Sequence, residues 1–144
     1  MVHIKDEGSH FDAPLDVVWK YVQSDIEHGS AHKGRRNFQR KALGESSVEL
    51  SWEQDVEGSW IKMTNRLTFL PPLGFVVEPL EGPLAGSKFV NYYTPKGSKT
   101  EVTVVGEWTS KTIPPAMLEK AVWANLEKVY HEDSDAIKQF TSKK

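Results

Sequence analysis

Two histidines at the spacing of a shared metal ion are the first residues whose types suggest chemistry. His28 and His32 lie four residues apart in a segment that we expect to be helical, so both imidazoles can face one side. Asp25 precedes His28 by three residues, whereas Gly29 weakens a helix. A stable site needs a third or fourth ligand, and the sequence places none. We therefore expect surface histidines near the mouth of a cavity, with no metal ion and no cofactor.

The usual groups of nucleophilic catalysis are missing from the sequence. There is no cysteine, and no serine lies in the Gly-x-Ser-x-Gly pattern of a nucleophile elbow. Gly82 and Gly86 lie four residues apart, but no Lys-Ser or Lys-Thr follows, so this segment predicts a wide hairpin turn rather than a phosphate loop. His131 and Glu132 lack the second histidine of a zinc-protease helix. We assign no catalytic residue.

Amide side chains on apolar strand faces point instead to ligand binding. Gln54, Asn65 and Asn91 fall at positions that we expect to face the interior. A buried amide must find a hydrogen-bond partner, which is a ligand or else another amide, a tyrosine or ordered water. Trp52 and Trp108 fall on the same faces and either line a pocket or fill it.

A locally basic segment offers a second place for binding. Its cations alternate over both faces of one expected strand, with Arg36 and Arg40 beside Phe38 on one face and Arg35 and Lys41 on the other. The following strand is acidic and can neutralise them. The formal net charge of the chain is −2. We expect no nucleic-acid partner.

The elements that position these residues begin with a strand over residues 2–11, in which Gly8 permits a bulge. Pro14 suits the first turn of a helix, and an apolar stripe follows it. Residues 24–27, Ser-Asp-Ile-Glu, match a capping box, which predicts a second short helix over residues 25–33.

A block of alternating residues between 35 and 110 predicts six strands separated by glycine and proline turns. The inward faces of three of these strands can be written directly: Val48, Leu50, Trp52, Gln54 and Val56; Ile61, Met63, Asn65, Leu67 and Phe69; Val102, Val104, Gly106 and Trp108. In the strand near residue 90, the inward-facing set is either Phe89, Asn91 and Tyr93 or Val90 and Tyr92, and we favour the first set. Arg66 and Glu107 are expected to face outward.

The chain ends in one long helix that opens at Pro114 and Pro115. Its apolar stripe comprises Leu118, Val122, Leu126, Val129, Ile137 and Phe140. About 25 residues at ~1.5 Å each give a helix on the order of 40 Å, long enough to cross a sheet. A helix of this length with one apolar side is expected to cover the apolar face of the strands.

Length and composition predict a single domain spanning residues 1–144. No stretch has the apolar core of a signal peptide or the eighteen apolar residues of a membrane span, so we expect a cytoplasmic protein.

The order of elements resembles the START, birch-pollen-allergen and polyketide-cyclase (SRPBCC) superfamily, which has the helix-grip fold. Residues 11–19, Phe-Asp-Ala-Pro-Leu-Asp-Val-Val-Trp, are similar to its opening motif, as are residues 106–108, Gly-Glu-Trp, and the Pro-Pro start of the last helix. The resemblance implies an α+β fold: a seven-stranded curved antiparallel sheet around a long C-terminal helix, with two short helices between strands 1 and 2. The turn after the second strand lacks the glycine-rich loop of the plant allergens, so no subfamily is assigned.

We expect a protein that binds a hydrophobic small molecule, lipid-like or aromatic, between the sheet and the last helix. The expected ligand-binding residues are Trp52, Gln54, Asn65, Leu67, Asn91, Tyr93, Trp108, Val122 and Leu126. One alternative is an enzyme of the polyketide cyclase or aromatase type, which requires a titratable group inside the cavity. Another is a co-chaperone-like module that binds a protein, for which a cavity closed around Trp52 and Trp108 is expected.

Overall fold

A computed structural model describes residues 1–28 and 32–142 of the chain. The elements in chain order are β1 (Val2–Phe11), α1 (Leu15–His28), β2 (Arg35–Ala42), β3 (Ser47–Val56), β4 (Ser59–Leu70), β5 (Gly74–Glu81), β6 (Lys88–Lys96), β7 (Lys99–Trp108) and α2 (Pro115–Ser142). The strands form one seven-stranded antiparallel sheet in the order β1-β7-β6-β5-β4-β3-β2. The expected helix-grip fold is confirmed.

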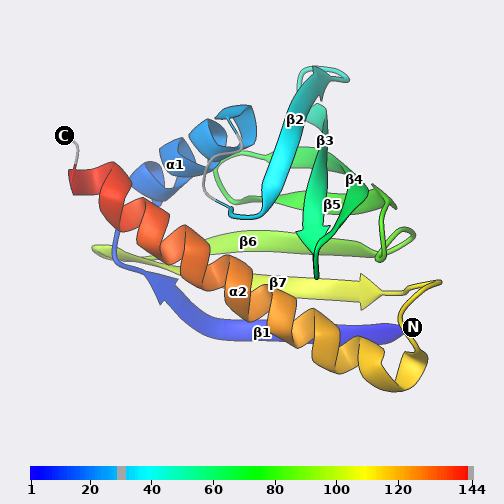
Figure 1. Ribbon diagram of the computed structural model, residues 1–144. Helices are drawn as coiled ribbons and strands as arrows, with labels where there is room; N and C mark the ends of the chain where they lie inside the picture. Colours follow the sequence, from blue (N-terminus) through cyan, green and yellow to red (C-terminus); the bar gives the residue numbers. More distant parts are fainter. Residues whose placement is uncertain (29–31, 143–144) are drawn as a thin grey trace.

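The long helix α2 runs diagonally across one face of the sheet, and its C-terminal end lies beside α1 (Figure 1). It has 28 residues and buries Leu118, Val122, Leu126 and Ile137. These positions are separated by four or eleven residues, so they share one side of the helix. The predicted stripe therefore faces the sheet.

One expected detail is wrong: the described residues after β1 form one helix rather than two. Ser24 lies inside α1, so the capping-box pattern does not begin a new helix. The buried stripe explains the continuity, because Val18, Val22 and Ile26 are all below 9% exposed and follow one another at four-residue intervals. Residues 29–31, which the expected second helix included, lie outside the described residues.

A bulge in β2 changes which basic side chains face inward. The register of β2 against β3 shifts between Arg36 and Gln39, and Asn37 between them has a φ of 55°. Arg35 and Phe38 consequently both lie on the inner face, whereas Arg36 forms an outward ion pair with Glu53 at 3.3 Å. The strict alternation predicted for this strand is therefore wrong, and one arginine enters the interior.

The core has two parts that meet under α2. The larger part joins α1, the middle of the sheet and the C-terminal half of α2. The smaller part surrounds Trp108, whose ring stacks on Phe89 with centroids 5.0 Å apart. Gly106 permits this contact, because a Cβ at that position would come within 2.5 Å of Phe89.

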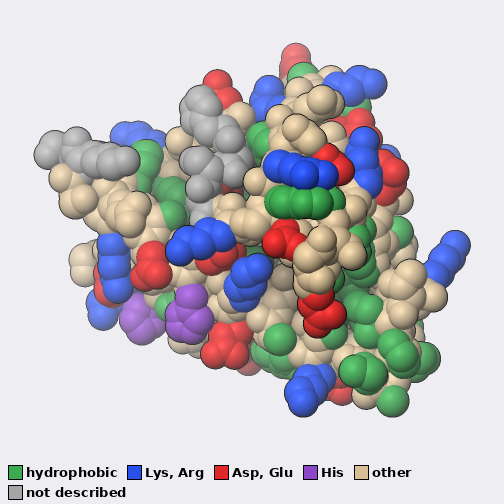
Figure 2. Space-filling view, viewed as in Figure 1, with side chains coloured by type: hydrophobic (Ala, Val, Ile, Leu, Met, Phe, Trp, Pro, Cys, Tyr) green, Lys and Arg blue, Asp and Glu red, His purple; other side chains and the backbone are tan. Residues whose placement is uncertain are grey.

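The space-filling view shows hydrophobic side chains on the surface where α2 begins (Figure 2). Met117 and Trp123 of this helix are 61% and 40% exposed. No helix among the described residues is long and apolar enough to cross a membrane.

Candidate functional site: a cavity with one ionisable end

A cavity of about 520 Å³ lies between the sheet and α2. Its volume falls within the range of small-molecule sites, roughly 300–1,000 Å³. Most of its wall is apolar, and the sheet contributes the side chains of Leu50, Leu67, Phe75, Val77, Val102 and Val104. The cavity therefore offers a ligand an apolar surface on one side and the helix on the other.

The residues expected to bind a ligand line this cavity, with one exception. The lining includes Trp52, Gln54, Asn65, Leu67, Asn91, Tyr93, Val122 and Leu126. The favoured inward set of β6 is confirmed, since Phe89, Asn91 and Tyr93 all face the cavity. Arg66 lies outside and pairs with Glu78 at 3.1 Å, and Glu107 is also on the outer face.

Trp108 is the exception. It is 1% exposed and packs among Ile4, Leu118 and Val122, so it fills the core beside the cavity instead of lining it. Periodicity places a side chain on a face of the sheet, but α2 decides whether it meets a void or another side chain. Trp108 is therefore a packing residue.

The three inward amides have different surroundings. Gln54 accepts a hydrogen bond from Trp52 Nε1 at 3.2 Å and donates to the carbonyl oxygen of Gly34 at 3.1 Å, so it holds the start of β2 in place. Among the described residues, the side-chain amides of Asn65 and Asn91 have no protein hydrogen-bond partner, although both residues line the cavity. Their amide groups are available to a ligand or to water.

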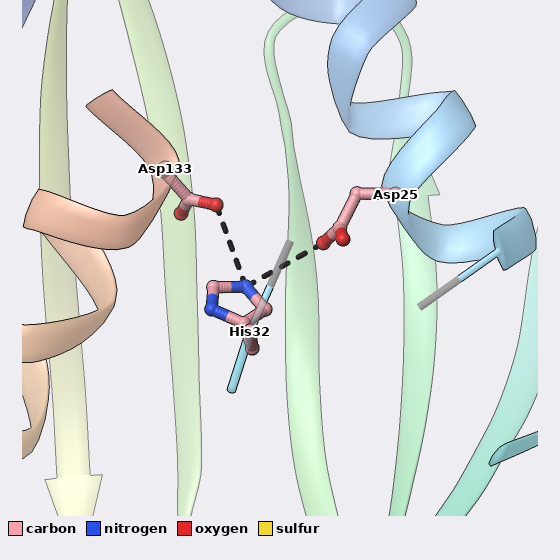
Figure 3. Close-up of side chains that lie close together, drawn as sticks. All are labelled: Asp25, His32 and Asp133. Atoms are coloured by element: carbon pink, nitrogen blue, oxygen red, sulfur yellow. Dashed lines mark ion pairs between the residues drawn. The ribbon is translucent and has the colours of Figure 1, made fainter. Parts of the chain in front are cut away.

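One end of the cavity is ionisable, and it gathers residues from three segments of the chain. Asp25 comes from α1, Asp133 from α2 and His32 from the segment before β2, with both carboxylates directed at the imidazole (Figure 3). His32 Nε2 lies 3.5 Å from Asp25 Oδ2 and 3.4 Å from Asp133 Oδ1. On the other side of the ring, Nδ1 lies 2.8 Å from Glu132 Oε1. The His32 side chain is only 9% exposed, so the expectation of a surface histidine is wrong for this residue.

The same end contains an inward cation and two phenols. Arg35 places its guanidinium 4.2 Å from the ring centroid of Trp52, and its buried Nε has no hydrogen-bond partner among residues 1–28 and 32–142. Tyr21 donates a hydrogen bond to Asp133 Oδ1 at 2.7 Å. Tyr93 is 6% exposed and lines the neighbouring wall.

Burial and mutual charge set the proton affinities of this group. Burial raises the pKa of Asp133 to about 6, although His32 and Tyr21 oppose the change. Burial alone would lower the pKa of His32, but the hydrogen bond to Asp25 and the charge of Asp133 outweigh it and leave that pKa raised. Burial also raises the pKa of Tyr93 well above its ordinary value. The group can therefore hold or move a proton near neutral pH, or hold a cation.

Asp133 was not predicted as a site residue, although the sequence contains a signal for it. Asp133 lies four residues after Val129 and four before Ile137, both of which belong to the predicted apolar stripe. A carboxylate inside such a stripe must be buried with partners, which marks a candidate site. A metal ion shared by His28 and His32 was considered and not predicted, and the His28 side chain lies outside the described residues.

Comparison with known proteins identifies the fold. No family model and no curated protein matches the sequence. The structure is similar to the Zhui aromatase/cyclase from a Streptomyces species, with 15% sequence identity, a TM-score of 0.73, and coverage of 94% of this chain and 90% of that one. It is also similar to a START superfamily protein from Mycobacterium smegmatis, with 11% identity, a TM-score of 0.75, and coverage of 96% and 99%.

A third similar structure is norcoclaurine synthase from Thalictrum flavum in complex with dopamine and hydroxybenzaldehyde. The identity is 15%, the TM-score is 0.70, and the match covers 99% of this chain and 87% of that one. At these identities the similarity establishes a shared helix-grip fold, which the START and polyketide-cyclase resemblance implied, and it leaves activity open.

Proposed function

We propose that this protein binds a hydrophobic small molecule, lipid-like or aromatic, in the cavity between the sheet and α2. The observation that carries the proposal is the 520 Å³ volume behind a mainly apolar wall. The side-chain amides of Asn65 and Asn91, which have no partner in the described part of the chain, supply polar contacts within that wall. The co-chaperone-like alternative predicts a cavity that is closed around Trp52 and Trp108. A cavity of this size therefore favours ligand binding over that alternative.

Native mass spectrometry of freshly purified protein tests the proposal, because a bound molecule adds a discrete mass. Displacement of an apolar fluorescent dye provides a second measurement. Val104→Phe fills the cavity and is expected to weaken dye binding by about tenfold or more, since Val104 lines it. Val105→Phe is the matched control, because its side chain lies on the opposite face of β7. Equal dye binding by the two variants would contradict the proposal.

The ionisable end favours a second candidate function, an enzyme of the cyclase or aromatase type. Such an enzyme needs a group that transfers a proton to or from the bound molecule. Asp133, whose pKa burial raises to about 6, and His32, whose pKa is also raised, both lie in the cavity wall. The test is deuterium exchange next to the carbonyl of a long-chain methyl ketone, followed by NMR. We expect wild-type protein to accelerate exchange and Asp133→Asn to lose most of the acceleration. No acceleration by wild-type protein would remove this candidate.

The location of the protein in the cell stays a prediction. Cell fractionation tests the cytoplasmic location expected from the sequence.

A further inference from the structure

We propose that Asp25, His32 and Asp133 bind a divalent transition-metal ion at the ionisable end of the cavity. Each of the three residues offers one ligand atom, and these atoms all lie within 4.8 Å of one another. His32 Nε2 is directed at Asp25 Oδ2 and Asp133 Oδ1. This inference departs from the sequence-based expectation of no metal ion. It also goes beyond the proposed binding of a hydrophobic molecule, because it assigns an inorganic ligand to residues that the apolar wall does not include.

The distances from the imidazole nitrogen to the two carboxylates fit one ion. Metal–nitrogen and metal–oxygen bonds of about 2.0–2.2 Å in tetrahedral geometry place neighbouring ligand atoms roughly 3.3–3.6 Å apart. His32 Nε2 lies 3.4 Å from Asp133 Oδ1 and 3.5 Å from Asp25 Oδ2. Both distances from the imidazole nitrogen therefore match those between ligand atoms that share one ion.

The orientation of the imidazole is a separate observation in favour of a metal ion. Glu132 contacts Nδ1 at 2.8 Å and also accepts a hydrogen bond from the backbone N–H of Lys33 at 3.3 Å. Metal-binding histidines commonly donate their second ring N–H to a carboxylate, which fixes the tautomer and the ring orientation. With Nδ1–H held by Glu132, the lone pair of neutral His32 lies on Nε2, toward Asp25 and Asp133. Metal binding then releases the proton that Nε2 carries when the ring is charged.

The charges at this end of the cavity also favour a cation. Three carboxylates, those of Asp25, Glu132 and Asp133, face one buried guanidinium, that of Arg35. Lys33 and Lys128 also line the cavity, but both are exposed. The carboxylate side chains are 15–23% exposed, so water screens them only in part. A divalent ion offsets the remaining negative charge.

Tyr21 holds one of the ligands in position. Its hydroxyl donates to Asp133 Oδ1 at 2.7 Å, and its ring packs edge-on against Phe140 with centroids 6.2 Å apart. The aspartate therefore cannot turn away without breaking a buried contact between α1 and α2.

Three protein ligands leave a coordination position for water or for a polar atom of a cavity ligand, as in catalytic rather than structural zinc sites. The mixture of one imidazole and two carboxylates suits zinc, iron(II), cobalt or manganese, whereas calcium and magnesium prefer oxygen ligands alone. An ion at this place would lie at the boundary between the apolar wall and solvent.

Titration of EDTA-stripped protein with Zn²⁺, measured by calorimetry, tests the inference. We expect one ion per chain, and we expect Co²⁺ to give the visible absorption of a site with nitrogen and oxygen ligands. His32→Gln and Asp133→Asn should each weaken Zn²⁺ binding by about 100-fold or more. Glu132→Gln, which removes only the partner of Nδ1, should weaken it by about 10- to 100-fold.

Two exposed residues of α2 provide matched controls. His131→Gln and Asp135→Asn remove the same functional groups near the site, and both variants should bind Zn²⁺ like wild-type protein. Circular dichroism checks the fold of each variant, and if Asp133→Asn is unfolded, His32→Gln and Glu132→Gln decide the result.

Three outcomes would overturn the inference: no binding by wild-type protein, unchanged binding by His32→Gln, or an equal loss in His131→Gln, which would indicate surface binding only. Dye binding measured on the same samples reports separately on the apolar cavity, so failure of the metal site is distinguishable from failure of the proposed function.

Discussion

The two halves of α2 face the same cavity with opposite chemistry. The N-terminal half presents Val122 and Leu126 to the sheet beside Trp108, where they belong to a cluster of hydrophobic side chains. The C-terminal half presents Asp133 to His32 and Tyr21, with Ile137 buried one turn further on. The comparison shows that one helix stripe can supply both a packing surface and a polar site, because each position faces a different neighbour.

The largest expected effect on stability comes from placing a carboxylate in the apolar N-terminal half of α2. Val122→Asp buries a charge at a position that is 1% exposed and that packs in a hydrophobic cluster with Trp108 and Leu118. We expect a loss of about 4 kcal/mol or more in the free energy of unfolding, measured by urea denaturation.

Ala124→Asp, on the exposed side of the same helix, is the control and should change stability by less than about 0.5 kcal/mol. A small effect of Val122→Asp would mean that the two halves of the helix tolerate charge equally, which contradicts the comparison.

A smaller effect is expected from Tyr21→Phe in the ionisable half. The change removes the hydrogen bond to Asp133 and leaves a buried carboxylate with one donor fewer. Since a hydrogen bond to a charged group contributes roughly 1.5–3 kcal/mol, we expect a loss of about 2 kcal/mol in urea denaturation. Tyr92→Phe on the opposite face of β6 is the matched control for loss of a phenol hydroxyl. If Tyr21→Phe were as stable as wild-type protein, the polar end would not hold α1 to α2.

The smallest effect concerns Tyr93, whose pKa burial raises well above its ordinary value. The unfolded chain ionises this phenol above about pH 10 whereas the folded chain resists ionisation, so stability falls as pH rises beyond that point. We expect Tyr93→Phe to make the fall in the free energy of unfolding with pH less steep, by up to about 1.4 kcal/mol per pH unit. Urea denaturation at successive alkaline pH values measures the slope, and an unchanged slope would show that the phenol ionises freely in the folded state.

The fold was largely predictable because its signals are local. Alternation along β3 and β4, glycine and proline at the turns, and the apolar stripe of α2 each depend on residues close together in sequence. The bulge that the sequence permits at Gly8 is present, since the register of β1 against β7 shifts between Asp6 and Ser9. The bulge at Asn37 was missed, because asparagine does not mark a bulge as glycine does, and Arg35 was therefore not placed in the interior.

The apolar wall of the candidate site was predicted for the same reason, whereas its ionisable end was not. Asp133 lies far along the chain from Asp25 and His32, and only the packing of α1 against α2 brings it to them. Sequence periodicity assigns a face to each residue but cannot tell which side chains of distant elements meet.

The sequence by itself determined the order of the elements, the inward faces of the strands and the covering helix, since hydrophobic periodicity specifies which side of each element must be buried. The tertiary structure alone decided that Trp108 fills the core, that Arg35 and His32 turn inward, and that Asp133 receives partners. These outcomes depend on long-range packing, in which the stability of a buried polar group is set by the residues that surround it.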